Sequence, residues 1–153
     1  MDKDALIQCV IGQLEEQLKT MQNATRASHD AATGSESKSE GKYDTRGLEA
    51  SYLAEAQAEQ CEKILQAIRS LKGFVAEKVS PETQIQVGSI VELESDGDLG
   101  YYMLLPHGGG IAVEYDDVEI TTVTPETPLY QALAGNKQGD LIEYRDSLIL
   151  EVI

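Results

Sequence analysis

The chain has 153 residues, which suffices for one ordinary domain or for two small units that share an interface. A hydrophobic content of 41% excludes general disorder, and no run of eighteen apolar residues marks a membrane span. The net charge of −15 is concentrated after residue 80, where 2 Lys and Arg stand against 14 Asp and Glu, and this excludes a direct DNA-binding surface there. A basic protein surface would be a better partner for this acidic half, and the alternative interpretation is that the acidity only keeps the protein soluble.

The N-terminal sequence and the cysteines favour a cytoplasmic protein. MDKDALIQCV lacks the basic start and the small-residue cleavage site of a signal peptide. Cys9 and Cys61 stand alone, without a CxxC or other metal-ligand spacing. We therefore expect reduced thiols, no membrane association and a cytoplasmic location.

Residues 1–80 carry the heptad spacing of an antiparallel coiled-coil hairpin. Helices of about 30 residues would each be roughly 45 Å long. Both seams are apolar far from residue 38 and polar close to it, which predicts a hairpin anchored at its open end, with a slim, polar tip near residues 33–46. A reversal at residue 38 would leave Cys9 and Cys61 roughly 9 Å apart along the axis, too far for a disulfide. The predicted seam consists of Ile7, Ile11, Leu14, Leu18, Met21, Thr25 and Ser28 in the first helix and Ala50, Ala54, Gln57, Cys61, Ile64, Ile68, Leu71 and Val75 in the second.

After residue 80 the hydrophobic period changes to two, which predicts strands. We expect strands in IQVGSIVELES and GYYMLLP, and one or two more in GGIAVEYDDVEITTVTP. TPLYQALAGNKQGD then breaks the alternation, because a Thr-Pro start, an apolar face of Leu129, Ala132 and Leu133, and a stop at Gly135 predict one short helix. LIEYRDSLILEVI closes the chain as a strand or hairpin. Residues 81–153 are thus expected to form a small acidic α+β domain of antiparallel strands with one short helix.

Three short motifs have both a functional and a structural interpretation. HGGG, beginning at His107, occurs in the oxyanion holes of some hydrolases, but no GxSxG nucleophile elbow accompanies it, so a glycine-rich loop is preferred. DGD at residues 96–98 lacks the glutamate at the twelfth position of a calcium loop and predicts a hairpin turn. His29, close to the tip on the first helix, is interpreted as a solvated side chain.

Carboxylates recur every four residues at the expected tip. Glu36, Glu40 and Asp44 would share one face of a helix, or crowd together at the narrow end of a loop, with Tyr43 beside them. Clustered carboxylate oxygens suit Mg²⁺, which takes one or two protein carboxylates and retains several waters. These three acids are therefore candidate metal ligands. The alternative is a solvated, charged turn that keeps the hairpin soluble.

The order of these elements resembles the Gre-type bacterial transcription elongation factors, which promote transcript cleavage. That family combines an N-terminal antiparallel coiled coil with an acidic tip and an FKBP-like C-terminal domain. TPETPLYQALAGNKQGDLIEY is similar to the family's run of Ser-Pro-Leu, a short helix ending in Leu-x-Gly, and then Gly-Asp before a strand. The resemblance covers essentially the whole chain and implies an FKBP-like fold for residues 81–153. The matching positions are Pro128, Leu129, Leu133, Gly135, Gly139 and Asp140.

At the tip the family has approximately Asp-x-x-Glu-Asn-x-x-Tyr, and this sequence has ESKSEGKY. The resemblance assigns catalytic roles to Glu36 in place of the aspartate, to Glu40 as the glutamate and to Tyr43 as the tyrosine. The two acids are spaced by four residues rather than three, Gly41 replaces the asparagine, and the tyrosine comes one residue early. A second register places Asp44, Glu49 and Tyr52 in these roles.

The resemblance implies that the protein binds bacterial RNA polymerase and is not itself an enzyme. Its hairpin would enter the secondary channel, where the tip carboxylates would help to hold a Mg²⁺ ion shared with the polymerase active site, which cleaves backtracked RNA. The acidic domain would dock near the channel entrance, and contact with the nascent RNA would be indirect. The free protein would be a monomer that does not bind Mg²⁺ tightly.

Three other functions stay open from the sequence. The altered spacing of the tip acids fits a non-catalytic channel binder that competes with cleavage factors and modulates transcription. Prolyl isomerase activity would need an apolar, aromatic-lined pocket, and the C-terminal half contains tyrosines but no Phe or Trp. A generic coiled-coil adapter would tolerate changes at the tip and would have no affinity for the polymerase.

Overall fold

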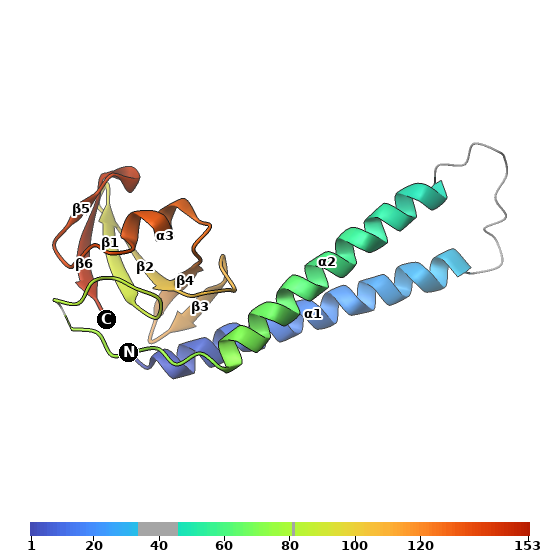
Figure 1. The fold of residues 1–153 in the computed structure, drawn as a ribbon, viewed down its shortest axis with the longest axis horizontal. Helices are drawn as coiled ribbons and strands as arrows, with labels where there is room; N and C mark the ends of the chain where they lie inside the picture. Colours follow the sequence, from blue (N-terminus) through green and yellow to red (C-terminus); the bar gives the residue numbers. More distant parts are fainter. Residues whose placement is uncertain (34–45, 81) are drawn as a thin grey trace.

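The computed structural model describes residues 1–33, 46–80 and 82–153, and Figure 1 shows how its parts are arranged. Two long helices, α1 (Lys3–Thr33) and α2 (Arg46–Lys72), run in opposite directions as a hairpin. A six-stranded sheet with one short helix lies at the end of the hairpin where the chain begins. The predicted α+β fold, a helical hairpin followed by a small β domain with one short helix, is confirmed.

Local signals explain where the hairpin begins and ends. Asp2 precedes α1, and its Oδ1 accepts hydrogen bonds from the backbone amides of Asp4 and Ala5, each at 3.1 Å, as a helix N-cap does. α2 carries Arg69 and Lys72 in its last turn, where cations stabilise the C-terminal end of the helix dipole. The open end of the hairpin is therefore specified by residues close to it in the sequence.

The seam between α1 and α2 is apolar at the base and becomes polar toward the tip, as predicted. Its basal members are buried because they pack against the other helix and the sheet. Its distal members reach solvent, which leaves the far part of the hairpin slim and accessible. Of the predicted seam, Ile7, Ile11, Leu14, Ile64, Ile68 and Leu71 are buried, Leu18, Met21, Thr25, Gln57 and Cys61 are half-buried, and Ala50 and Ala54 are exposed.

Two details of the predicted hairpin are wrong. α2 ends at Lys72, so the predicted seam residue Val75 lies outside the helix and is 77% exposed. A reversal at residue 38 would place Thr25 opposite Ser51, but the Thr25 hydroxyl lies 3.2 Å from Oε1 of Gln57, about one heptad farther along α2. The seam pattern permits this register because a shift of about one heptad again places seam positions opposite seam positions.

The structure describes six strands: β1 (Ile90–Ser95), β2 (Asp98–Leu104), β3 (Ala112–Tyr115), β4 (Val118–Val123), β5 (Leu141–Ile142) and β6 (Ser147–Val152). They belong to one sheet, in the order β3-β4-β2-β1-β6-β5. Neighbouring strands are antiparallel except for β2 and β4, which are parallel. This parallel pair departs from the expected all-antiparallel domain. After β2 the chain first forms the edge strand β3 and then turns back as β4, which lies between β3 and β2. A parallel pair requires a crossover connection of this kind. The remaining elements are the short helix α3 (Pro128–Leu133) and the 3₁₀ turn η1 (Tyr144–Asp146).

The turn and helix signals of the β domain are confirmed. Asp96 and Gly97, between β1 and β2, have φ values of 54° and 88°, and a two-residue type I′ hairpin turn requires positive φ at both positions. Thr127 caps α3, since its Oγ1 accepts a hydrogen bond from the backbone amide of Tyr130 at 3.3 Å. The last segment of the chain forms the β5–β6 hairpin.

Two apolar cores lie on opposite faces of the sheet. The hairpin-side core joins the base of the hairpin, including Leu71, to a sheet face that carries Ile90 and Met103. The α3-side core lies beneath the opposite face and contains Leu133. Because the hairpin-side core crosses the predicted boundary at residue 80, the division of the chain into two independent units stays a prediction.

Three smaller expectations concern the helices and the thiols. In the described part of the chain, no helix is both long enough and apolar enough to cross a membrane. Cys9 and Cys61 are both free, as expected. His29 is exposed on α1.

Candidate functional site

The distal end of the hairpin is the first candidate site. The described part of α1 ends at Thr33 and α2 begins at Arg46, so the chain between them carries the carboxylates that the sequence singles out. Their roles as catalytic residues and metal ligands stay predictions. The predicted residues Glu36, Glu40, Tyr43 and Asp44 all lie outside the described residues.

Two residues of the second tip register, Glu49 and Tyr52, are described, and both are exposed on α2. Glu49 lies in the first turn of the helix, where a carboxylate stabilises the N-terminal end of the helix dipole. Tyr52 is three residues farther along and is therefore its neighbour on the helix surface. Among the residues that the structure describes, no three His, Cys, Asp or Glu side chains come together in a way that could hold a metal.

A groove of about 520 Å³ runs between the two helices below the tip, and although most of the residues that line it are polar, the surface they turn toward it is mainly apolar. Thr25 links its two sides: the hydroxyl donates to the backbone carbonyl of Met21 at 3.0 Å and lies 3.2 Å from Oε1 of Gln57 across the groove. Arg26 and Cys61 also line it. Polar contacts thus join the helices where the apolar seam has faded.

The distal part of α2 exposes three large apolar side chains that the seam pattern does not predict. Leu48, Tyr52 and Leu53 are 57%, 63% and 60% exposed. Leu48 and Tyr52 are four residues apart and therefore share a strip of the helix surface. A strip of this kind suits contact with another macromolecule better than it suits stability. An apolar i, i+4 pair outside the seam is the sequence signal that could have found it.

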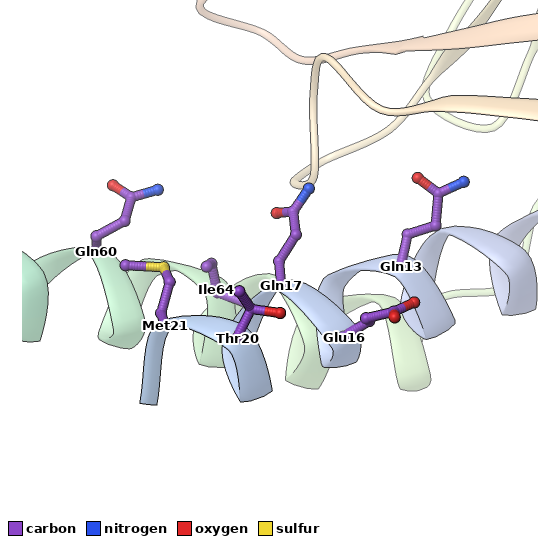
Figure 2. Close-up of a pocket in the computed structure, with 7 residues that line it drawn as sticks. All are labelled: Gln13, Glu16, Gln17, Thr20, Met21, Gln60 and Ile64. Atoms are coloured by element: carbon purple, nitrogen blue, oxygen red, sulfur yellow. The ribbon is translucent and has the colours of Figure 1, made fainter. Parts of the chain in front are cut away.

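A second groove, of about 720 Å³, lies along the middle of the hairpin. Figure 2 shows Gln13, Gln17 and Gln60 pointing to the same side of the hairpin, with parts of the β domain opposite Gln13 and Gln17. Gln13 makes a defined contact in this direction, since its Nε2 donates to the backbone carbonyl of Ala112 in β3 at 2.9 Å. This hydrogen bond and the hairpin-side core fix the hairpin to the β domain.

The HGGG segment is a loop, as its structural interpretation predicts, and it packs against the base of the hairpin. Gly108 has a φ of 79°, and a Cβ at this position would lie 3.3 Å from Cδ1 of Leu14 and 3.4 Å from Cδ1 of Leu71. Its carbonyl accepts a hydrogen bond from Oγ1 of Thr122 at 2.6 Å. Gly108 therefore combines a left-handed backbone with a close approach to both helices, and each favours glycine.

Alanine at Gly108 is expected to destabilise the protein more than alanine at Gly110. Both glycines have positive φ, 79° and 78°, so each substitution strains the backbone by about 1 kcal/mol. Only at Gly108 does the new methyl group press on the hairpin, because nothing lies within 4 Å of a Cβ at Gly110. We expect about 1 kcal/mol of additional loss for Gly108→Ala in the free energy of unfolding, measured by urea denaturation. Equal losses in the two variants would show that the contact with the hairpin contributes nothing.

Comparison with known proteins finds solved structures of Gre-factor homologues. GreA factor homolog 1 (Gfh1) of Thermus thermophilus is 21% identical, covering 94% of this chain and 94% of its own, with a TM-score of 0.35. Gfh1 of Thermus aquaticus is 22% identical over 92% of each chain, with a TM-score of 0.35. A further structure of the transcription factor Gfh1 is 22% identical, covering 89% of this chain and 81% of its own, with a TM-score of 0.34.

No protein-family model matches the sequence, and no curated protein matches it either. Gfh1 is a homologue of the Gre-type factors that the sequence motifs of this chain resemble. Because their identities are below 25% and their TM-scores below 0.5, they carry no argument about function, and the proposals that follow rest on the residues of this chain.

Proposed function

We propose that this protein is a bacterial RNA polymerase factor whose hairpin enters the secondary channel and promotes Mg²⁺-dependent cleavage of backtracked RNA. The observation that carries the proposal is the hairpin itself. Its helices of 31 and 27 residues are apolar and anchored at the base and increasingly polar toward the far end. At 1.5 Å per residue, α2 alone is about 40 Å long. A slim arm of this length can carry side chains from a docked domain to a remote active site.

The carboxylates between the two helices give the arm its proposed chemistry. Glu36 and Glu40 would bind Mg²⁺ through their oxygens, with Asp44 as a further ligand and Tyr43 beside them. Bound Mg²⁺ lowers the pKa of a coordinated water and stabilises charge on a scissile phosphate. The reaction centre would belong to the polymerase, so the protein would act as an accessory factor in the cytoplasm and hydrolyse nothing alone.

A second candidate function is supported by the sequence of the tip. Glu36 and Glu40 are four residues apart and Gly41 follows them, whereas the family pattern has a spacing of three and an asparagine. Ligands placed one residue out of register would fail to share one metal ion in a fixed active site. The hairpin would then occupy the channel without promoting cleavage and would compete with factors that do.

The test is RNA cleavage in backtracked elongation complexes of the cognate polymerase. We expect the purified protein to bind the polymerase and to accelerate shortening of the transcript in the presence of Mg²⁺. Binding without acceleration would favour the non-catalytic channel binder. A protein that does not bind the polymerase at all would contradict both functions and leave the adapter interpretation.

A further inference from the structure

Part of the sheet face that turns toward the hairpin is not covered by it. On β2, Met103 belongs to the hairpin-side core, and because side chains alternate along a strand, Tyr101 and Leu99 point to the same face. Burial falls along this series: Met103 is 1% exposed, Tyr101 is half-buried and Leu99 is 60% exposed. In Figure 1 the hairpin meets the sheet near β3, and β5 and β6 lie at the other edge. The hairpin therefore leaves the far half of this face open.

Strand register extends the open part across four strands. Leu99 on β2 pairs with Glu94 on β1, Glu94 pairs with Leu148 on β6, and Leu148 pairs with Leu141 on β5. Paired residues share a face, so these four side chains form a row of roughly 14 Å, given a strand spacing of about 4.8 Å. Leu141 at the end of the row is 71% exposed. The row thus presents exposed leucines on either side of a carboxylate.

A second row on the same face is acidic. Tyr101 pairs with Glu92, and Glu92 pairs directly with Glu151 on β6. The Tyr101 hydroxyl donates to Oε1 of Glu92 at 2.6 Å, and this hydrogen bond, together with burial and the charges of Glu92 and Glu151, raises the pKa of Tyr101. Like charges directly opposite each other on neighbouring strands are destabilising. Stability therefore does not explain why two glutamates face each other here.

No cation of the β domain neutralises these carboxylates. Residues 81–153 contain only Lys137 and Arg145 as cations, and within the described part of the chain neither forms an ion pair with them. The Arg145 guanidinium lies over the ring of Tyr144, 5.7 Å from its centroid, and Tyr144 packs against the α3-side core. We name the six residues Glu92, Glu94, Leu99, Leu141, Leu148 and Glu151 the open sheet face.

We propose that the open sheet face is the surface through which the β domain binds a basic segment of RNA polymerase. The inference rests on the polymerase as the partner proposed above. Lys or Arg side chains of that segment would pair with Glu92, Glu94 and Glu151, and its aliphatic side chains would cover Leu99 and Leu141. Charge complementarity favours a basic partner on this face. A second copy of the chain would place its own carboxylates against Glu92, Glu94 and Glu151, and a nucleic acid would place phosphates there, so both would be repelled.

The first test removes charge from the open sheet face and compares it with a matched pair elsewhere. Glu94→Gln/Glu151→Gln leaves the Tyr101–Glu92 hydrogen bond in place. The control, Glu114→Gln/Glu119→Gln, removes two carboxylates that pair directly between β3 and β4 and alternate with core residues, so they lie on the opposite face. We expect the first variant to bind purified polymerase about tenfold more weakly, with a flatter dependence on salt, and the control to bind like the wild type.

The second test removes the apolar part. Leu99→Ser/Leu141→Ser alters two exposed side chains, so the melting temperature should stay close to that of the wild type. We expect polymerase binding to weaken about tenfold or more, as loss of a buried apolar contact at an interface does. An unchanged melting temperature with weakened binding separates recognition from folding.

Each other outcome overturns the proposal and identifies what failed. If the wild type binds polymerase and both open-face variants bind equally well, the docking surface lies elsewhere and the proposed function stands. If the wild type does not bind polymerase, both fail. If sedimentation shows that the wild type is a dimer and Leu99→Ser/Leu141→Ser is a monomer, the occupant of the face is a second copy.

Discussion

The double substitution Glu36→Ala/Glu40→Ala is expected to remove the stimulation of RNA cleavage while leaving the fold intact. Loss of even an outer-shell partner of a metal ligand costs 10–100-fold in affinity or activity, so loss of both proposed ligands should lower the cleavage rate by about 100-fold or more. Charged residues that are not part of a packed core change stability by about 0.5 kcal/mol or less. Measured on the same preparation, the rate of cleavage of backtracked RNA should therefore fall, whereas the free energy of unfolding from urea denaturation should stay unchanged.

α2 offers a matched control for this experiment. Glu55 and Glu59 are exposed on the helix and have the same four-residue spacing, so Glu55→Ala/Glu59→Ala makes the same change in charge on the same arm. This variant should cleave like the wild type. If both double variants lose cleavage, the effect reflects the charge of the arm and not metal binding at the tip. Loss of cleavage in Glu49→Ala alone would instead select the second tip register.

Features set by neighbouring residues could be predicted from the sequence. Helix α3 follows from Thr127, which caps it, and from the spacing of Leu129 and Leu133, which are both buried. The Asp96–Gly97 turn follows from the preference of these residue types for positive φ. The polar gradient of the hairpin follows from side-chain types alone. In each case the decisive contacts lie within a few residues of one another.

Features set by distant contacts could not be predicted. A seam that repeats every seven residues does not fix the register of α1 against α2, so Thr25 lies opposite Gln57 and not Ser51. Leu6 and Val10 are buried against the sheet on a second apolar strip of α1, which only tertiary packing explains. The parallel β2–β4 pair also depends on where the chain crosses over.

The tip and the open sheet face differ in the same way. The carboxylates of the tip are visible as a run of sequence, although their arrangement lies outside the described residues. The open sheet face is not visible in the sequence, because Leu99 and Leu141 are far apart in the chain and come into one row only through the pairing of β2, β1, β6 and β5. Its acidic content could be counted from the sequence, but its position could not.

Leu71→Ala is expected to have the largest effect on stability. Leu71 is 1% exposed in the hairpin-side core, and its Cδ1 lies where the Gly108 loop meets the helices. Removing a fully buried leucine side chain leaves a cavity and costs about 3 kcal/mol, within a usual range of roughly 2–5 kcal/mol. For a chain of this size the melting temperature should fall by roughly 10 °C. Leu53→Ala, on the same helix but 60% exposed, is the control and should stay within about 0.5 kcal/mol of the wild type.

Two signals decide whether hairpin and β domain unfold as one unit. Far-UV circular dichroism follows mainly the two long helices, whereas tyrosine absorbance follows mainly the β domain, which holds Tyr101, Tyr102, Tyr115, Tyr130 and Tyr144. Because the core around Leu71 contains side chains from both parts, Leu71→Ala should shift both transitions together. A shift of the helical signal alone would mean that the parts unfold separately and that residue 80 is a true domain boundary. A common shift would mean that the hairpin and the β domain unfold cooperatively through the core that they share.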